Sequence, residues 1–223
     1  MSQVNTSDDT GLSSSAGDTI DDILGAMACP ITTRVPLVEP GTETPEVSKI
    51  YDQCRKLYGI VPKFIQLLAH APGTAKSFLK FDEEIKVAAL RAGERERSRM
   101  LVLSILKPSL DNSCHNCAHH NVNLARGLGY NDEQLAAIAS GKWRENNDFS
   151  EKEKVVLDWA DAVTHMSASC DQVTFDVMRD HFTNAEIVEL TYTTALWNCT
   201  NRLAEALHLT AEPPGKGIDW GTD

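Results

Sequence analysis

Helix-start signals recur along most of the chain, with no credible strand between them. A capping box places Ser, Thr or Asn three residues before Glu or Gln, so that both side chains satisfy free amides of the first helical turn. Three pairs have this spacing: Asn131 with Gln134, Ser150 with Glu153, and Thr183 with Glu186. Thr44 followed by Pro45 and Glu46 is a further start signal. The sequence therefore predicts an all-α fold.

Apolar residues at helical spacing place the predicted helices. The ranges are 44–59, 61–70, 74–90, 94–106, 113–126, a short helix from 131, a helix from 150, and a last helix over 183–207. The segment KPSLDN, residues 107–112, is predicted to be a loop. Residues 1–28 are rich in Ser, Thr, Asp and Gly and are expected to form a flexible tail, with residues 20–27 as a candidate short docked helix. The folded domain is expected over 29–213, followed by a loose tail over 214–223.

The charge of the chain limits its partners. Its 32 acidic and 21 basic residues give a formal net charge of -11, which repels nucleic acids and anionic membranes. No long apolar run predicts a transmembrane span, and no secretory signal is visible, so a cytoplasmic location is expected. Because thiols are kept reduced in the cytoplasm, the six cysteines do not indicate a disulfide framework.

A weak internal repeat relates two parts of the chain. Glu186 precedes Asn198 by twelve residues, and a second asparagine follows three residues later. Glu96 precedes Cys114 by eighteen residues, and a second cysteine follows at the same interval. The two spacings differ by six residues, which is the length of KPSLDN. We interpret the match as two degenerate helical hairpins, one carrying cysteines and the other asparagines.

The segment SCHNCAHHN concentrates reactive side chains at the start of a predicted helix. Free amides and the helix dipole stabilise a thiolate there, and one helical turn brings Cys114 and Cys117 within reach of a disulfide. Peroxide oxidation of one thiol gives a sulfenic acid, which the other thiol converts to a disulfide. His120 shares the face of Cys117, and Glu96 is expected on the adjacent helix, where it would orient a histidine or accept a proton.

Two other interpretations of this segment stay open. Cys114, Cys117, His119 and His120 are ligand types that zinc prefers, but no second C-x-x-C or H-x-x-H accompanies them, so no metal is expected. The remaining alternative is a surface helix with two inert thiols. No other cofactor is indicated.

The chain resembles the carboxymuconolactone decarboxylase and alkylhydroperoxidase D superfamily over roughly residues 48–213. The resemblance rests on GIVPKFIQLLAHAP, ERERSRMLVLS, CHNCAHHNVNLARGLG, FSEKEKVVLDWADAVT and HFTNAEIVELTYTTALWNCTNRLAEAL. It implies a two-repeat helical fold and a homo-oligomer such as a trimer, hexamer or dimer. It also implies that Cys117 attacks peroxide, that Cys114 resolves it, and that a lipoylated or other dithiol partner supplies electrons.

The sequence departs from the family pattern at two positions. The family usually has a histidine four residues after the second cysteine, where this chain has Asn121, and His120 stands one residue earlier, about 100° around the helix. The family also places a glutamate on the preceding helix to relay protons with the histidine. The longer KPSLDN segment leaves both Glu96 and Glu94 as candidates for this role.

The leading hypothesis is a thiol-dependent peroxidase or disulfide oxidoreductase, with Cys117 as nucleophile, Cys114 as resolving thiol, His120 as base and Glu96 as its partner. One alternative is a lyase, isomerase or hydrolase of a small organic acid or lactone, in which His120 and Glu96 carry the chemistry. Another is a non-catalytic, redox-sensing oligomer. Fold-level kinship does not decide between reaction types.

Overall fold

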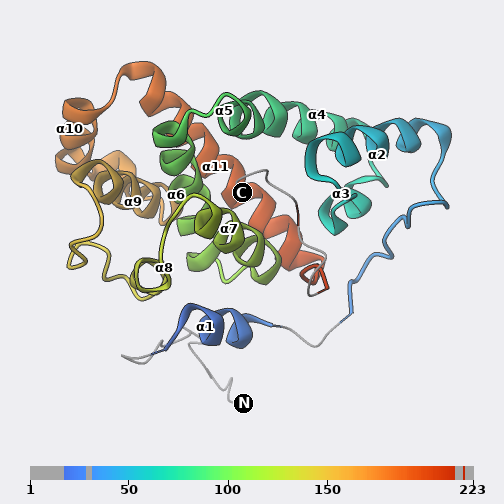
Figure 1. The fold of residues 1–223 in the computed structure, drawn as a ribbon, viewed down its shortest axis with the longest axis horizontal. Coiled ribbons are helices and arrows are strands. Elements are labelled where there is room, and N and C mark those ends of the chain that lie inside the picture. The colour runs from blue at the N-terminus through green and yellow to red at the C-terminus, as the bar shows by residue number, and fades with distance from the viewer. Residues whose placement is uncertain (1–17, 29–31, 214–217, 219–223) are drawn as a thin grey trace, which may run out of the picture.

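The computed structural model describes residues 18–28, 32–213 and 218. Every regular element in these ranges is a helix (Figure 1), which confirms the predicted all-α class. The α-helices are α1 (Ile20–Met27), α2 (Pro45–Tyr58), α3 (Lys63–Leu68), α4 (Pro72–Asp82), α5 (Ala88–Arg91), α6 (Arg95–Asp111), α7 (His115–Gly127), α8 (Asp132–Ala139), α9 (Glu151–Thr164), α10 (Gln172–His181) and α11 (Asn184–Ala206). A π-helical turn, η1 (Glu83–Val87), joins α4 to α5, and a 3₁₀ turn, η2 (Ala168–Cys170), precedes α10. None of the described helices is long and apolar enough to cross a membrane.

The start signals read from the sequence are confirmed as N-caps. The capping boxes at Asn131, Ser150 and Thr183 all have both of their side-chain hydrogen bonds. Thr44 caps α2, which ends at Gly59, where φ is 73° and a residue without a Cβ is favoured. These helix starts depend on contacts within three residues, so the sequence alone is enough to locate them.

The candidate helix near the N-terminus is confirmed as α1. A capping box from Thr19 starts it, and Ile20 and Leu24 are buried against α7 and α8. Asp21 pairs with Arg126 of α7 at 3.0 Å. Residues 18–28 of the predicted tail are therefore folded onto the domain, whereas residues 1–17, 29–31, 214–217 and 219–223 lie outside the described residues.

Helices α6, α9 and α11 form the centre of the main core. Every residue of α6 from 100 to 110 is buried, because α7, α9 and α11 cover it on different sides. Helices α2, α3 and α4 form a second apolar cluster around Tyr51, Ile65 and Leu79. In Figure 1, this second group lies at the opposite end of the molecule from α9 and α10, with α7 and α11 between them.

The structure corrects the predicted loop at residues 107–112. Helix α6 continues through Asp111 and contains Pro108. The burial of Leu110, and the pairing of Lys107 with acids from α6 and α9, stabilise this last turn against the break that proline favours. Tertiary contacts thus override the local signal.

Two more helical features differ from the expected pattern. The single helix expected over 74–90 is interrupted by the π-helical turn η1, and α10 was not predicted.

In the repeat, Glu186, Asn198 and Asn201 lie on the one continuous helix α11, whereas Glu96 and the cysteines lie on the two helices α6 and α7.

Candidate functional site

The C-x-x-C pair lies at the N-terminus of α7, as predicted. Ser113, with φ of 51°, turns the chain between α6 and α7, and Cys114 is the N-cap residue. The Cys114 Sγ accepts a hydrogen bond from the backbone N–H of Cys117 at 3.4 Å. Both cysteines are buried free thiols on the same helical turn.

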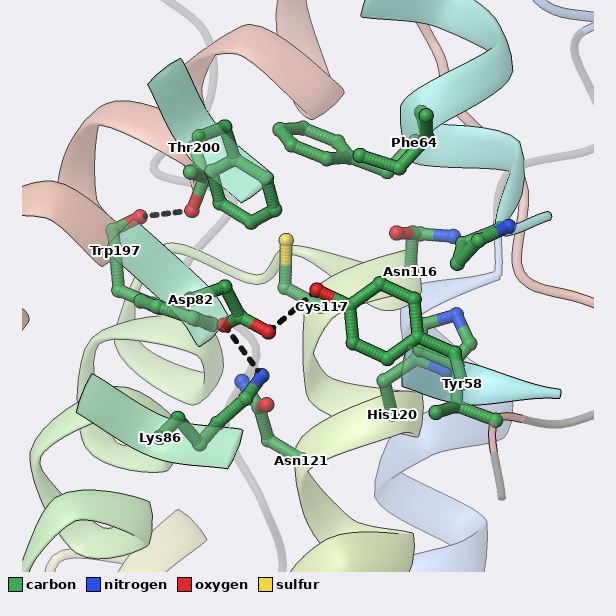
Figure 2. A pocket seen from close by; sticks show the side chains of 14 residues that line it. Tyr58, Phe64, Asp82, Lys86, Asn116, Cys117, His120, Asn121, Trp197 and Thr200 are labelled. Carbon is green, nitrogen blue, oxygen red and sulfur yellow. Dashed lines mark hydrogen bonds and ion pairs between the residues drawn. The ribbon is translucent and has the colours of Figure 1, made fainter. Parts of the chain in front are cut away.

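Cys117 lines a cavity of about 60 Å³, and Cys114 does not. Figure 2 shows the sulfur of Cys117 pointing into this cavity, between aromatic side chains and a group of polar ones. The aromatic members are Tyr58, Phe64, Phe78 and Trp197, and the polar members include Asp82, Lys86, Asn116, His120, Asn121 and Thr200. The volume is several times the roughly 10–15 Å³ that holds one water molecule, so the cavity has room for a small substrate.

A buried ion pair forms one wall of the cavity. Asp82 at the end of α4 pairs with Lys86 of η1, and the Oδ1 to Nζ distance is 2.8 Å. The Tyr58 hydroxyl donates a hydrogen bond to the Asp82 Oδ2 at 2.6 Å, and the Lys86 ammonium lies 4.9 Å from the ring centroid of Trp197. Burial and the neighbouring Asp82 raise the pKa of Tyr58, so this phenol stays protonated. The wall is polar, but its charges cancel.

The surroundings of Cys117 favour the protonated thiol. The hydrogen bond with Cys114 and burial both raise the pKa of Cys117 well above its usual value. The helix N-terminus acts in the opposite direction but does not overcome the burial. Cys117 therefore needs a nearby base to form the thiolate.

His120 is neutral and buried at the cavity, with 8% of its surface exposed. Burial lowers its pKa to about 3, and the nearby charges of His119, Lys86 and Lys63 act in the same direction. Its Nε2 makes no hydrogen bond. The imidazole is thus uncharged at neutral pH and binds a proton more weakly than an exposed histidine does.

Asn121, at the position where the family usually has histidine, connects α7 to α6. Its Nδ2 donates to the Ser109 Oγ at 3.0 Å and to the Ile105 carbonyl at 3.4 Å. The buried amide is therefore committed to contacts between two helices.

The structure does not bring Glu96 together with the other three predicted residues. Its exposed carboxylate pairs with Lys152 at 2.8 Å, and Glu94 pairs with Arg97 at 2.7 Å. The expected contact between Glu96 and His120 is corrected for a geometric reason. Because α6 continues to Asp111, Glu96 lies about 22 Å along the helix axis from the end that precedes α7.

Sequence reasoning missed four residues near Cys117 and His120. Three of them, Tyr58, Asp82 and Lys86, lie on predicted amphipathic helices. Nothing in the sequence shows that the Asp82 and Lys86 side chains are buried together at a cavity. Glu212 follows the last helix, and its Oε1 lies 3.9 Å from the His120 Nε2. No local pattern indicated that this segment returns to the cavity.

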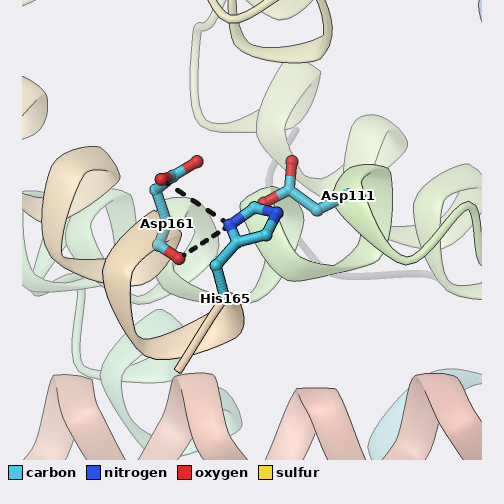
Figure 3. A group of neighbouring side chains, drawn as sticks. All are labelled: Asp111, Asp161 and His165. Atoms are coloured by element: carbon cyan, nitrogen blue, oxygen red, sulfur yellow. Dashed lines mark hydrogen bonds and ion pairs between the residues drawn. The ribbon is translucent and has the colours of Figure 1, made fainter. Parts of the chain in front are cut away.

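A separate group of possible metal ligands is occupied by a lysine. Asp111, Asp161 and His165 converge in Figure 3, and among the described residues no other group of three such side chains does so. The ammonium of Lys107 lies 2.5 Å from the Asp111 Oδ1 and 2.6 Å from the Asp161 Oδ1. It already supplies the positive charge that a cation would bring.

Comparison of the sequence with family models and with curated proteins finds no match. Comparison of the fold with solved structures does find matches. An uncharacterized peroxidase-related protein from Silicibacter sp. TM1040 has a TM-score of 0.67 at 20% identity, over 81% of this chain and 92% of the other. An uncharacterized peroxidase-related protein from Ralstonia eutropha JMP134, described as an alkylhydroperoxidase AhpD core, has a TM-score of 0.67 at 19% identity, over 83% and 94% of the two chains.

A characterised activity occurs among the similar structures. The debrominase Bmp8, as a cysteine-to-alanine variant in complex with 2,3,4-tribromopyrrole, has a TM-score of 0.65 at 17% identity, over 81% of this chain and 94% of the other. At these identities the likeness establishes the fold. The chain has the AhpD-like helical fold, and this fold includes at least one enzyme.

Proposed function

We propose that the protein is a thiol-dependent peroxidase of the AhpD type. The observation that carries the proposal is the arrangement of the cysteine pair: Cys117 faces the cavity, and Cys114 lies behind it on the same helical turn. The thiol that meets substrate is thus distinct from the thiol that follows it in reaction. This division matches the roles that the family resemblance implies.

The reaction needs two thiols and one base. The thiolate of Cys117 attacks the terminal peroxide oxygen, the O–O bond breaks, and an alcohol or water leaves after protonation. Cys117 becomes a sulfenic acid, and the thiol of Cys114 then displaces hydroxide, which leaves as water, to form the Cys114–Cys117 disulfide. A dithiol or lipoylated partner reduces this disulfide by exchange and is itself oxidised.

His120 is the proposed base for the first step. It lies one helical turn after Cys117, lines the same cavity and is uncharged at neutral pH. The S–H bond of Cys117 breaks, and its proton passes to the imidazole. Because the pKa of Cys117 is raised and the pKa of His120 is lowered, this transfer is unfavourable in free energy and would limit the rate of peroxide attack.

The cavity favours a small, uncharged and largely apolar substrate. Aromatic rings form much of its wall, and the Asp82–Lys86 pair offers hydrogen bonds without net charge. A small organic hydroperoxide combines an apolar body with one polar group and meets both conditions. Hydrogen peroxide fits the volume but does not use the aromatic wall.

The test is single-turnover oxidation followed by mass analysis. The reduced protein is mixed with cumene hydroperoxide, tert-butyl hydroperoxide or hydrogen peroxide, and disulfide formation between Cys114 and Cys117 is followed in time. We expect a stoichiometric disulfide, lost in Cys117→Ser and retained in Cys170→Ser, which removes an exposed thiol as the matched control. Unchanged peroxide consumption by Cys117→Ser would contradict the proposal.

A second candidate function is thiol-dependent dehalogenation of a small haloaromatic compound. The four aromatic side chains at the cavity favour it, as does the fold shared with Bmp8. In this reaction the two thiols supply two electrons, halide leaves, a proton replaces it on the ring, and the cysteines end as a disulfide. Release of bromide from a bromopyrrole, without oxidation by any hydroperoxide, would favour this candidate over the first.

A further inference from the structure

The chain after α11 returns to α3 and α7 beside the cavity and is held there by several hydrogen bonds. We call residues 208–213 the C-terminal strap. The Lys63 Nζ of α3 donates to the Thr210 Oγ1 at 3.0 Å and to the Ala211 carbonyl at 2.7 Å. From α7, the Asn116 Nδ2 donates to the Thr210 carbonyl at 3.0 Å. The strap is therefore fixed to α3 and α7, two of the helices that border the cavity.

These contacts bring one acid of the strap beside His120. The backbone N–H of Lys63 donates to the Glu212 Oε1 at 2.6 Å, which orients the carboxylate. The same oxygen lies 3.9 Å from the His120 Nε2, and the two side chains are only 7% and 10% exposed. A closer approach of about 1 Å would give a normal hydrogen bond, and catalytic hydrogen bonds are often long until substrate binds.

Among the described residues, Glu212 is the only acid with a carboxylate oxygen within 4 Å of a His120 ring nitrogen. The charged or titratable groups that act on His120 are His119, Lys86 and Lys63, and all of them are basic. Asp82 is directed to Lys86 and Tyr58. Glu212 itself is close to Lys63 and to the exposed Glu39. An imidazolium formed at His120 would therefore depend on Glu212 for a negative charge.

We propose that Glu212 is the positioning residue of His120, in the role that the family resemblance gives to a glutamate of the preceding helix. The inference rests on the proposed function of Cys117 and His120. When the proton of Cys117 passes to the imidazole, the Glu212 carboxylate stabilises the resulting positive charge. The strap thereby supplies the acid next to His120, whereas Glu96 of α6 is paired with Lys152.

Burial of the pair supports this role. It raises the pKa of Glu212 and lowers the pKa of His120 to about 3, so the buried imidazole without a partner holds a proton weakly. A carboxylate beside the imidazole favours its protonated form and so opposes the effect of burial on His120.

The experiment compares four variants with the wild-type protein. Glu212→Gln keeps the size of the side chain and its acceptor for the Lys63 amide, and Glu39→Gln is the matched control that removes a neighbouring exposed charge. His120→Gln and the double variant His120→Gln/Glu212→Gln complete a cycle. Each is measured for the single-turnover rate of Cys117 oxidation between pH 5.5 and 8.5, and for thermal unfolding.

We expect Glu212→Gln to slow oxidation roughly tenfold to a hundredfold, part of the effect of a general base, and to change the pH profile. In Glu39→Gln the oxidation rate should stay within about twofold of wild type, and the pH profile should not change. The double variant should be no slower than His120→Gln, because Glu212 acts through the histidine. The inference would be overturned if Glu212→Gln oxidised at the wild-type rate. It would also be overturned if the double variant were slower than His120→Gln by the same factor that Glu212→Gln slows the wild-type protein.

A second measurement separates this inference from the proposed function. The ring nitrogen shifts of His120 at pH 7 report its tautomer and hydrogen bonding without any turnover. If the wild-type protein does not react with peroxide, the proposed function fails, and these shifts still decide the inference. The His120 nitrogen shifts should differ from wild type in Glu212→Gln and match wild type in Glu39→Gln. Identical shifts in the wild type and both variants would rule out the pairing of His120 with Glu212. If Glu212→Gln does not fold, Glu212→Asp is substituted for it.

Discussion

The Lys86 Nζ lies 2.8 Å from the Asp82 Oδ1, and both side chains are buried in the wall of the cavity that Cys117 faces. The pair spans the junction between α4 and the π-helical turn η1. Such turns are frequent at functional sites because they redirect side chains within a helix. A full positive and a full negative charge are thus held inside the protein, next to the reactive thiol.

Loss of Lys86 should destabilise the protein strongly. Lys86→Met leaves the Asp82 carboxylate buried without its ammonium, and breaking such a pair costs about 3–5 kcal/mol of unfolding free energy. Urea unfolding monitored by tryptophan fluorescence measures this quantity. Lys86→Met/Asp82→Asn should recover much of the loss, whereas Lys80→Met, which removes one member of an exposed pair, should change stability by less than about 1 kcal/mol.

Replacement of Cys114 should separate the two steps of the proposed reaction. In Cys114→Ser, Cys117 can still attack peroxide, but no second thiol removes the sulfenic acid. We expect one added oxygen atom on the peptide that contains Cys117, trapped by dimedone and visible by mass spectrometry, with loss of repeated turnover. A disulfide between Cys117 and any other cysteine would contradict the assignment of Cys114.

Stability should fall at acidic pH partly because of His120. Its pKa is about 3 in the folded protein and about 6.5 when unfolded, so between these values the unfolded state binds more protons. This contribution is fully present above about pH 6.5 and is lost as the pH falls toward 3. At pH 4.5 the loss amounts to roughly 2–3 kcal/mol.

Urea midpoints at pH 7 and pH 4.5 measure this difference. The loss between the two pH values should be smaller in His120→Gln than in the wild-type protein, because glutamine does not take up a proton. His70→Gln, at an exposed histidine, is the control and should follow the wild type. Equal losses in all three proteins would show that His120 is not buried in its neutral form.

Lys107 should be essential for the acidic group at the end of α6. The ammonium contacts Asp111 and Asp161 and lies 4.7 Å from the ring centroid of Trp143. Lys107→Met leaves two carboxylates close together, so we expect about 3–5 kcal/mol of destabilisation. Addition of millimolar Mn²⁺ should raise the melting temperature of Lys107→Met but not that of the wild type. If Mn²⁺ stabilises both proteins equally, the ammonium does not fill this site.

Local signals in the sequence were sufficient for much of the helical framework. The capping residues Asn131, Ser150 and Thr183, and the cysteine pair at the start of α7, act within one helical turn and are found where they were predicted. The same local reasoning was wrong at Pro108. Burial of the surrounding residues outweighs the tendency of that proline to end a helix.

The candidate site was predictable only where its residues are close in sequence. Cys114, Cys117 and His120 follow one another on α7, so their proximity follows from helix geometry. Tyr58, Asp82 and Glu212 come from distant segments, and their places depend on how α2, α4 and the C-terminal strap pack against α7.

The sequence by itself determined most of the helices, the position of the two thiols at a helix start and the histidine that follows them. Only the tertiary structure decided that Cys117 faces the cavity, that Glu96 points to solvent and that Glu212 lies beside His120. The physical reason is the range of the interactions. Caps and helical spacing act over three or four residues, whereas burial depends on which surfaces meet when the whole chain folds.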